Sequence, residues 1–197
     1  MGRRYPLGDE GHSASRAAHR IPFGARRRLI REHELSVEAG EAAFEETARM
    51  WDALTGAELI QAMADGRFPQ ISDINDHIGQ VITSAEPGRV GVSWTPAEKL
   101  CNPGGIVHGG YIAMILDNAV CLAGSSTCEH FMPMLTLNLN VDYLRAVRAG
   151  ETYTVAGTCV HPGSTRMVAN AVISDAQGRP VAQASASVLP NKAFARE

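Results

Sequence analysis

Residues 102–117 constrain the fold of this 197-residue chain more than any other segment, because a glycine-rich loop gives way there to an apolar helix. The segment reads NPGGIVHGGYIAMILD, in which a histidine lies between two glycine pairs. Gly109 and Gly110 permit a sharp backbone turn and present bare N–H groups at a helix start. The apolar residues that follow predict a helix from about Gly109 to Ala123, which Gly124-Ser125-Ser126 would end.

The sequence around this helix alternates between apolar and polar residues in the way typical of β-strands. A short helix is expected at residues 71–77. One long helix among five or six strands predicts an α+β fold, in which an antiparallel sheet wraps around the helix. Such a sheet has an exposed edge, so we expect this chain to pair with another copy of itself. The expected strands cover residues 80–85, 89–95, 134–145, 152–161, 166–174 and 180–189.

The first third of the chain differs from the rest. Residues 1–31 hold eight of the sixteen arginines and only two acidic residues, so we expect residues 1–35 to form a flexible basic segment. Helical periodicity predicts an extension over residues 36–68, with one helix that stops at Gly56 and a second from Ala57 to Ala64. The extension could pack on the main domain, lengthen a ligand pocket or contact another subunit. The main domain is expected at residues 69–190, followed by a tail at 191–197.

Composition narrows the possible functions. A net charge of −3 gives no reason to expect nucleic acid binding. No apolar run approaches the ~20 residues that span a bilayer, and the N-terminus lacks the apolar core of a secretory signal. We therefore expect a cytoplasmic protein without membrane contact. Four cysteines lack the spacing of metal ligands, so we expect reduced thiols and no metal site; they are Cys101, Cys121, Cys128 and Cys159.

Asp117 is the least expected residue of the apolar helix, because a buried carboxylate is costly without partners or a task. It follows Gly109 by eight residues and has Leu116 and Ala119 as neighbours. Such an acid could pair with an arginine, turn outward beside Asn118, or perform chemistry. A helix start that polarises an oxygen, together with a buried carboxylate, is what acyl-transfer hydrolysis requires.

These residues resemble those of the hotdog-fold acyl-CoA thioesterases of the phenylacetate-degradation type. The likeness rests on His108-Gly109-Gly110, on Asp117 eight residues after the first glycine, on Asn102 six residues before the histidine, and on the run LTLNLNVDYL at residues 135–144. It covers roughly residues 70–190. The resemblance implies a hotdog fold, an antiparallel sheet around one long central helix. It also implies hydrolysis of an acyl or aryl thioester to the free acid and coenzyme A, without a cofactor.

The resemblance further implies roles for individual residues. Asp117 would act as the nucleophile on the thioester carbon or as the general base that activates water, and both remain open. The Gly109 N–H would polarise the thioester carbonyl, although the glycines could serve only close packing. His108 would orient the loop or the substrate near the sulfur, although it could simply cap the helix. Asn102 would align the thioester or the attacking water, and Thr136 would position that water.

A coenzyme A phosphate site is implied at the rim of the sheet, because arginine suits phosphate oxygens. The candidates for this site are Arg145, Arg148, His161 and Arg166. The alternative interpretation is that these are ordinary solvated side chains of the surface.

Some hotdog thioesterases carry a hydroxyl one turn after the catalytic acid, where this chain has Cys121. We interpret this cysteine as a small core residue, because mid-helix no positive charge is evident to lower its pKa.

The family also builds its sites across two subunits, which implies a homodimer or a dimer of dimers that binds acyl-CoA. Two other functions remain open. One is a non-catalytic hotdog protein that binds or senses acyl-CoA. The other is a hotdog dehydratase or hydratase, although the catalytic motifs of those enzymes are not found in this sequence.

Overall fold

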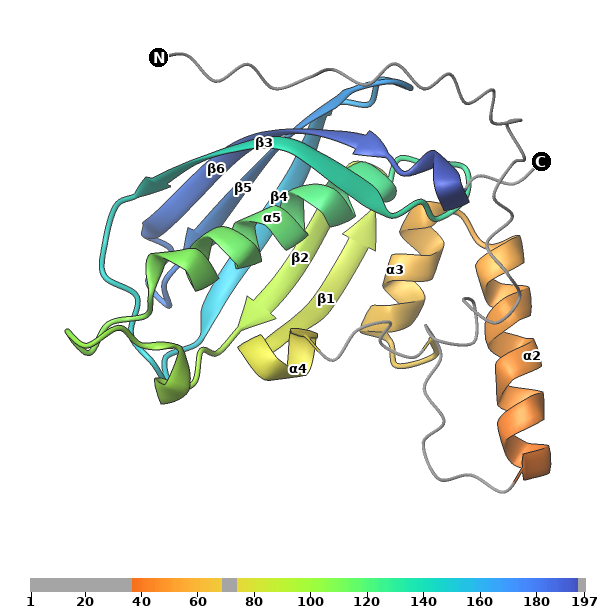
Figure 1. The fold of residues 1–197 in the computed structure, drawn as a ribbon, viewed down its shortest axis with the longest axis horizontal. Helices are drawn as coiled ribbons and strands as arrows, with labels where there is room; N and C mark the ends of the chain where they lie inside the picture. The colour runs from red at the N-terminus through yellow and green to blue at the C-terminus, as the bar shows by residue number, and fades with distance from the viewer. Residues whose placement is uncertain (1–36, 69–73, 195–197) are drawn as a thin grey trace, which may run out of the picture.

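The computed structural model describes residues 37–68 and 74–194, and shows one six-stranded antiparallel sheet with helices on one face (Figure 1). The expectations for residues 1–36, for residues 69–73 (the start of the main domain and of the short helix expected at 71–77), and for the last three residues of the tail lie outside these ranges. The helices are α2 (Val37–Ala53), α3 (Gly56–Ala64), α4 (Ile74–Ile78) and α5 (Gly109–Ser125), with two short 3-10 turns, η1 (Glu98–Leu100) and η2 (Lys192–Phe194). The strands are β1 (Gln80–Glu86), β2 (Arg89–Trp94), β3 (Met134–Tyr143), β4 (Tyr153–His161), β5 (Met167–Ser174) and β6 (Pro180–Pro190).

The strands lie in the order β1-β2-β4-β5-β6-β3, so β1 and β3 form the two edges of the sheet. Each strand runs antiparallel to its neighbours. The long helix α5 lies across the concave face of this sheet (Figure 1). The predicted α+β hotdog architecture is therefore confirmed, with all six expected strands and the central helix in place.

The core forms where the apolar stripe of α5 meets the sheet. Ile112, Ile115, Leu116 and Ala119 follow the spacing of one helix face, and each is at most 4% exposed. Small inward-facing residues let the helix approach the strands closely. At Gly157 on β4, an added Cβ would lie 2.4 Å from the Ala119 carbonyl oxygen, so only glycine fits this contact.

The helical extension packs on the main domain, which was one of the three arrangements left open by the sequence. Gly56 does not end the first helix as predicted: α2 ends at Ala53, and Gly56 is the first residue of α3. The reason is a capping box, in which the Thr55 hydroxyl accepts from the Glu58 N–H and the Thr55 N–H donates to the Glu58 carboxylate.

Contacts on both sides of α3 fix this extension to the sheet and to α5. The Gly56 N–H donates to the Cys128 carbonyl at 3.0 Å, which joins α3 to the turn that follows α5. Trp51 packs edge-on against Phe131 with 5.0 Å between ring centroids. Leu59 and Ile60 of α3 are fully buried, in a second hydrophobic cluster beside the main core. None of the helices in the described part of the chain is long and apolar enough to cross a bilayer.

Candidate active site

The first half of the candidate site is the start of α5, where His108 is the N-cap residue. Its side-chain Nδ1 accepts a hydrogen bond from the Gly110 N–H at 3.0 Å. A neutral ring whose Nδ1 accepts must carry its proton on Nε2, so Nε2–H is the outward donor of His108. The Gly109 N–H has no acceptor among the described residues. It therefore remains available at the positive end of the helix.

Tyr143, the last residue of β3, covers this helix start. Its hydroxyl donates to the Gly109 carbonyl at 3.0 Å, and an added Cβ at Gly109 would lie 3.3 Å from its ring. Tyr143 was not among the site residues predicted from the sequence. Its only signal was its place at the end of the strand that also carries Thr136.

Asn102 organises the loop that precedes the helix. Its Oδ1 accepts from the Gly104 N–H at 2.9 Å and from the Ile106 N–H at 3.4 Å. The Asn102 N–H donates to the Ile106 carbonyl at 2.8 Å, which closes the loop. Because the side-chain oxygen is occupied by the backbone, the amide nitrogen Nδ2 is the part of Asn102 that can reach a ligand.

The second half of the site is built around Asp117, which is half-buried on the side of α5 that faces β3. The Thr136 hydroxyl donates to Asp117 Oδ1 at 2.8 Å. No arginine or lysine of the described ranges pairs with Asp117, so the ion-pair interpretation finds no support in this part of the chain. The carboxylate is held in place by a neutral hydroxyl and keeps lone pairs for other partners.

Cys121 extends this arrangement by one hydrogen bond. Its Sγ lies 3.4 Å from Thr136 Oγ1. Since the single proton of the Thr136 hydroxyl goes to Asp117, the thiol donates to Thr136. Burial, reinforced by the nearby Asp117 charge, raises the pKa of Cys121 to about 11, so the thiol stays protonated at neutral pH. Cys121 packs against the core as expected, and it also orients the hydroxyl that holds Asp117.

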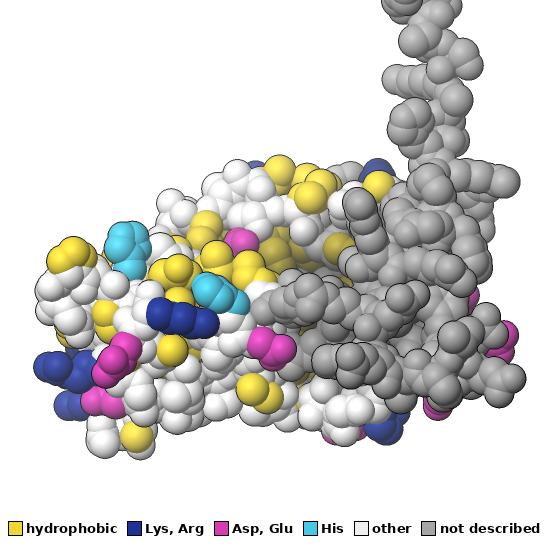
Figure 2. All heavy atoms as spheres, turned by 60° about the horizontal axis from the view of Figure 1, so that its bottom comes forward, with side chains coloured by type: hydrophobic (Ala, Val, Ile, Leu, Met, Phe, Trp, Pro, Cys, Tyr) yellow, Lys and Arg dark blue, Asp and Glu magenta, His cyan; other side chains and the backbone are white. Residues whose placement is uncertain are grey.

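The two halves lie apart in one copy of the chain. Gly109 and Asp117 are eight residues apart on α5, which places them ~12 Å apart along the helix axis at 1.5 Å per residue. One thioester group cannot touch both positions. Figure 2 shows that hydrophobic side chains, bordered by acidic, basic and histidine side chains, are exposed on the face turned toward the viewer.

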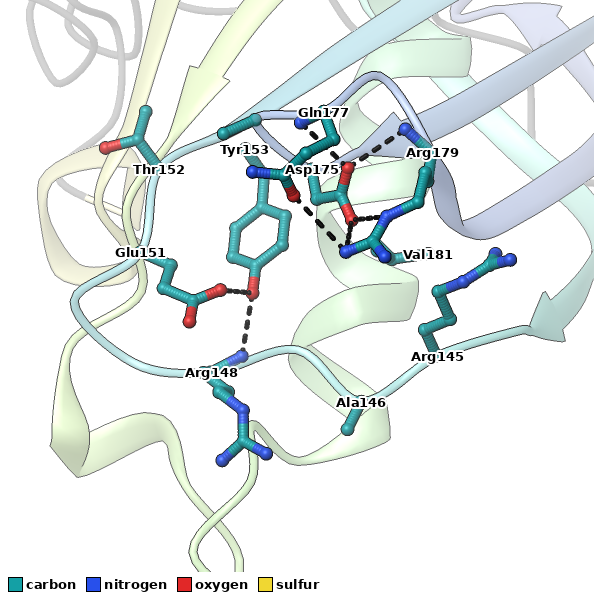
Figure 3. A pocket seen from close by; sticks show the side chains of 11 residues that line it. Arg145, Ala146, Arg148, Glu151, Thr152, Tyr153, Asp175, Gln177, Arg179 and Val181 are labelled. Carbon is teal, nitrogen blue, oxygen red and sulfur yellow. Dashed lines mark hydrogen bonds and ion pairs between the residues drawn. The ribbon is translucent and has the colours of Figure 1, made fainter.

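Arg145 and Arg148 both line a polar hollow of about 480 Å³ (Figure 3). The Arg145 guanidinium donates to the Pro180 carbonyl, and both arginines are exposed. The hollow adjoins the first half of the site. The Val107 N–H, just before His108, donates at 2.9 Å to the carbonyl of Val147, which stands between Ala146 and Arg148 of the lining. Its remaining lining residues include Glu151, Thr152, Tyr153, Asp175, Gln177 and Arg179.

His161 and Arg166 lie at the opposite end of β4. The two ends of β4, Tyr153 and His161, are eight residue steps apart, which is ~26 Å at about 3.3 Å per step. Met167 and Val188 face α5 at Gly124. Their neighbours in the chain, Arg166 and Ser187, therefore point to the other face of the sheet.

There the Arg166 guanidinium donates to the Ser187 hydroxyl at 2.7 and 3.0 Å. The structure thus separates the four phosphate candidates into two pairs. No cluster of three or more histidine, cysteine or acidic side chains suited to a metal occurs among residues 37–68 and 74–194.

The sequence and the fold of this chain are similar to those of known proteins. A family model described as the thioesterase superfamily matches residues 104–182, which include Gly109 and Asp117 but not Asn102. Human acyl-coenzyme A thioesterase 13 is 27% identical over 129 residues, covering 64% of this chain and 87% of that protein.

Two solved structures share the fold at similar levels of identity. The structure of smu.793 from Streptococcus mutans UA159 bound to acetyl CoA has a TM-score of 0.52 at 30% identity, covering 56% of this chain and 86% of that chain. A phenylacetic acid degradation-related protein from Ralstonia eutropha JMP134 has a TM-score of 0.59 at 25% identity, covering 66% of this chain and 98% of that chain.

Proposed function

Because this chain belongs to the thioesterase superfamily and is a thioester hydrolase, we propose that it hydrolyses acyl-coenzyme A to the free acid and coenzyme A. The family match also confirms the resemblance noted in the sequence. The observation that carries the proposal is the pairing, within one fold, of a carboxylate held by a hydroxyl with an N–H donor that lacks an acceptor among the described residues. Asp117 supplies the first and Gly109 the second.

In the general-base route, Asp117 takes a proton from a water whose oxygen attacks the thioester carbon. The carbonyl oxygen gains negative charge, which the Gly109 N–H stabilises at the positive end of the helix. The C–S bond then breaks, and the departing sulfur receives the proton from Asp117. In the nucleophilic route, an Asp117 oxygen attacks the carbon directly, coenzyme A leaves, and water hydrolyses the resulting anhydride. Both routes yield the same products.

The separation of Gly109 and Asp117 supports a site shared between two copies. The Gly109 end of one copy would face the Asp117 end of another, so that both groups meet at one carbonyl. The edge strand β3 is the natural place for the pairing, because Leu135 and Leu137 on it are 47% and 54% exposed. A homodimer, or a dimer of dimers, is thus part of the proposal.

The other candidates receive roles from their positions. His108 presents Nε2–H beside Gly109, where it can orient the thioester near its sulfur. Asn102 offers its amide nitrogen to the thioester or to the attacking water. Arg145 and Arg148 adjoin the Gly109 half and are proposed to contact the coenzyme A phosphates. His161 and Arg166, at the far end of β4, remain candidates for the same phosphates.

The proposal is tested by measuring release of coenzyme A with a thiol-trapping reagent. Short, medium, long and aromatic acyl-CoAs form the panel, and the wild-type chain is the enzyme. Turnover well above the uncatalysed rate on at least one of them is expected. Saturable binding of acyl-CoA without any release of thiol would contradict the proposal and favour the binding protein.

A subunit-exchange experiment tests the shared site. Gly109→Pro deletes the N–H donor, and the proline fits the first helical position because His108 before it is already extended, with φ −63° and ψ 134°. Gly109→Ala is the matched control, since it keeps the N–H and adds the same Cβ beside Tyr143. Asp117→Asn and Gly109→Pro should each lower turnover about 100-fold or more when tested alone, which leaves a small residual rate.

Random exchange of the two impaired variants should restore about a quarter of wild-type turnover, because half of the dimers are mixed and each mixed dimer has one intact site. Verified mixed dimers without activity, formed from two folded variants, would show that Gly109 and Asp117 do not share a site.

A further inference from the structure

Tyr143 and His108 hold the same peptide unit of the helix start. That unit joins Gly109 to Gly110. Its oxygen accepts from the Tyr143 hydroxyl at 3.0 Å, and its N–H donates to His108 Nδ1 at 3.0 Å. A donor on the oxygen polarises the peptide group and strengthens the bond that its N–H makes. The unit is therefore fixed at both ends.

The preceding peptide unit, which joins His108 to Gly109, is fixed as well. Its oxygen accepts from the Tyr111 N–H at 2.9 Å, and its N–H is the donor without an acceptor among the described residues. The orientations of these two units together set the φ and ψ angles of Gly109. Glycine has more freedom in both angles than any other residue, so an unconstrained glycine pair would not hold the N–H in one direction.

We infer that Tyr143 is a positioning residue, which holds the Gly109–Gly110 peptide against His108 and thereby aims the Gly109 N–H at the substrate carbonyl. The inference rests on the proposed function for its kinetic consequence, but the hydrogen bonds that define it are independent of any substrate. Tyr143 does not itself touch the reacting atoms. Its ring, 3.3 Å from the position of a Gly109 Cβ, also limits movement of the helix start.

The kinetic test is Tyr143→Phe, which removes the hydroxyl and keeps the ring. Loss of one hydrogen bond of this kind should lower kcat about 3- to 10-fold, with KM changed less than about 2-fold, because only an interaction made in the transition state is weakened. The matched control is Tyr111→Phe on the same helix turn, whose hydroxyl bonds to no described residue. That control should keep the wild-type kcat.

The same substitution in the Gly109→Pro background separates positioning from a general structural role. Without the Gly109 N–H there is nothing left for Tyr143 to aim, so Tyr143→Phe should not lower the residual turnover further. An equal loss of kcat in both backgrounds would overturn the inference, because it would show that Tyr143 acts through something other than Gly109.

Amide hydrogen exchange, followed by NMR without substrate, tests the hydrogen bonds directly. The Gly110 amide proton should exchange several-fold faster in Tyr143→Phe than in wild type or Tyr111→Phe. Unchanged exchange in Tyr143→Phe would overturn the inference, whatever the enzyme hydrolyses. Faster exchange in a chain that hydrolyses no acyl-CoA would support the role of Tyr143 in holding the Gly109–Gly110 peptide and would contradict the proposed function.

Discussion

The hydrogen bond from Thr136 to Asp117 makes Thr136→Val the most informative single change after a change of Asp117, the proposed catalytic carboxylate. Valine keeps the branched shape of threonine and deletes only the hydroxyl, which lies 2.8 Å from Asp117 Oδ1. A hydrogen bond to a charged group contributes about 1.5–3 kcal/mol. Because Asp117 is half-buried and Thr136 is exposed in one copy, the lower end applies. A loss of about 1.5 kcal/mol corresponds to roughly a 10-fold fall in kcat.

The assay is steady-state release of coenzyme A, accompanied by thermal unfolding of each variant. Thr136→Ser, which keeps the hydroxyl, should retain kcat within about 3-fold, since the hydrogen bond survives. Thr158→Val, an exposed threonine of β4, controls for the change of residue type and should behave as wild type. The reasoning is refuted if Thr136→Val keeps full turnover, or if Thr136→Ser loses as much as Thr136→Val.

Two further predictions concern packing and titration. Gly56→Ala should lower the free energy of unfolding by about 2–4 kcal/mol, because its Cβ would lie 1.9 Å from the Ser125 carbonyl oxygen. Gly91→Ala, whose Cβ would lie 2.5 Å from the Ser84 hydroxyl and 3.0 Å from the Thr83 hydroxyl, both of which can move, should cost less than about 1 kcal/mol. Equal losses of the two variants in chemical denaturation would contradict this. The Cys121 thiol, whose pKa rises from 9.0 to about 11 on folding, should favour the folded state below pH 9, and this contribution should disappear as the pH rises toward 11. Relative to Cys121→Ala, the stability of wild type should therefore fall over that interval, and parallel pH profiles of the two would show that the thiol does not titrate abnormally.

Local patterns in the sequence were sufficient to predict the scaffold. The stripe of Ile112, Ile115 and Leu116 identifies the central helix, because one face of it repeats with helical spacing. Boundaries were less certain. The strand expected to reach Arg145 ends at Tyr143, since the N–H groups of Leu144 and Arg145 both donate to the Val181 carbonyl and the chain leaves the edge there.

Contacts between distant segments could not be read from local patterns. Tyr143 meets Gly109 across 34 residues, and nothing near either residue indicates this approach. Arg166 lay in the sequence among plausible phosphate ligands, yet strand alternation turns it away from α5 and toward Ser187. Gly163, three residues before Arg166, is another example. A Cβ at Gly163 would lie 2.3 Å from the Arg166 carbonyl oxygen, and the local sequence gives no sign of this close contact. Such arrangements depend on register and packing, which only the folded chain specifies.

The measurement that tests the central claim most directly is the turnover of Asp117→Asn on the best acyl-CoA, compared with wild type. The introduced amide would keep the size of the side chain but could neither attack the thioester nor accept a proton from water, so kcat should fall about 100-fold or more. The matched control is Asp142→Asn, because Asp142 is an exposed acid of β3 that bonds only to Gln183 among the described residues, and it should keep wild-type turnover. A folded Asp117→Asn protein that releases coenzyme A at a near-normal rate would remove Asp117 from the mechanism and contradict the account.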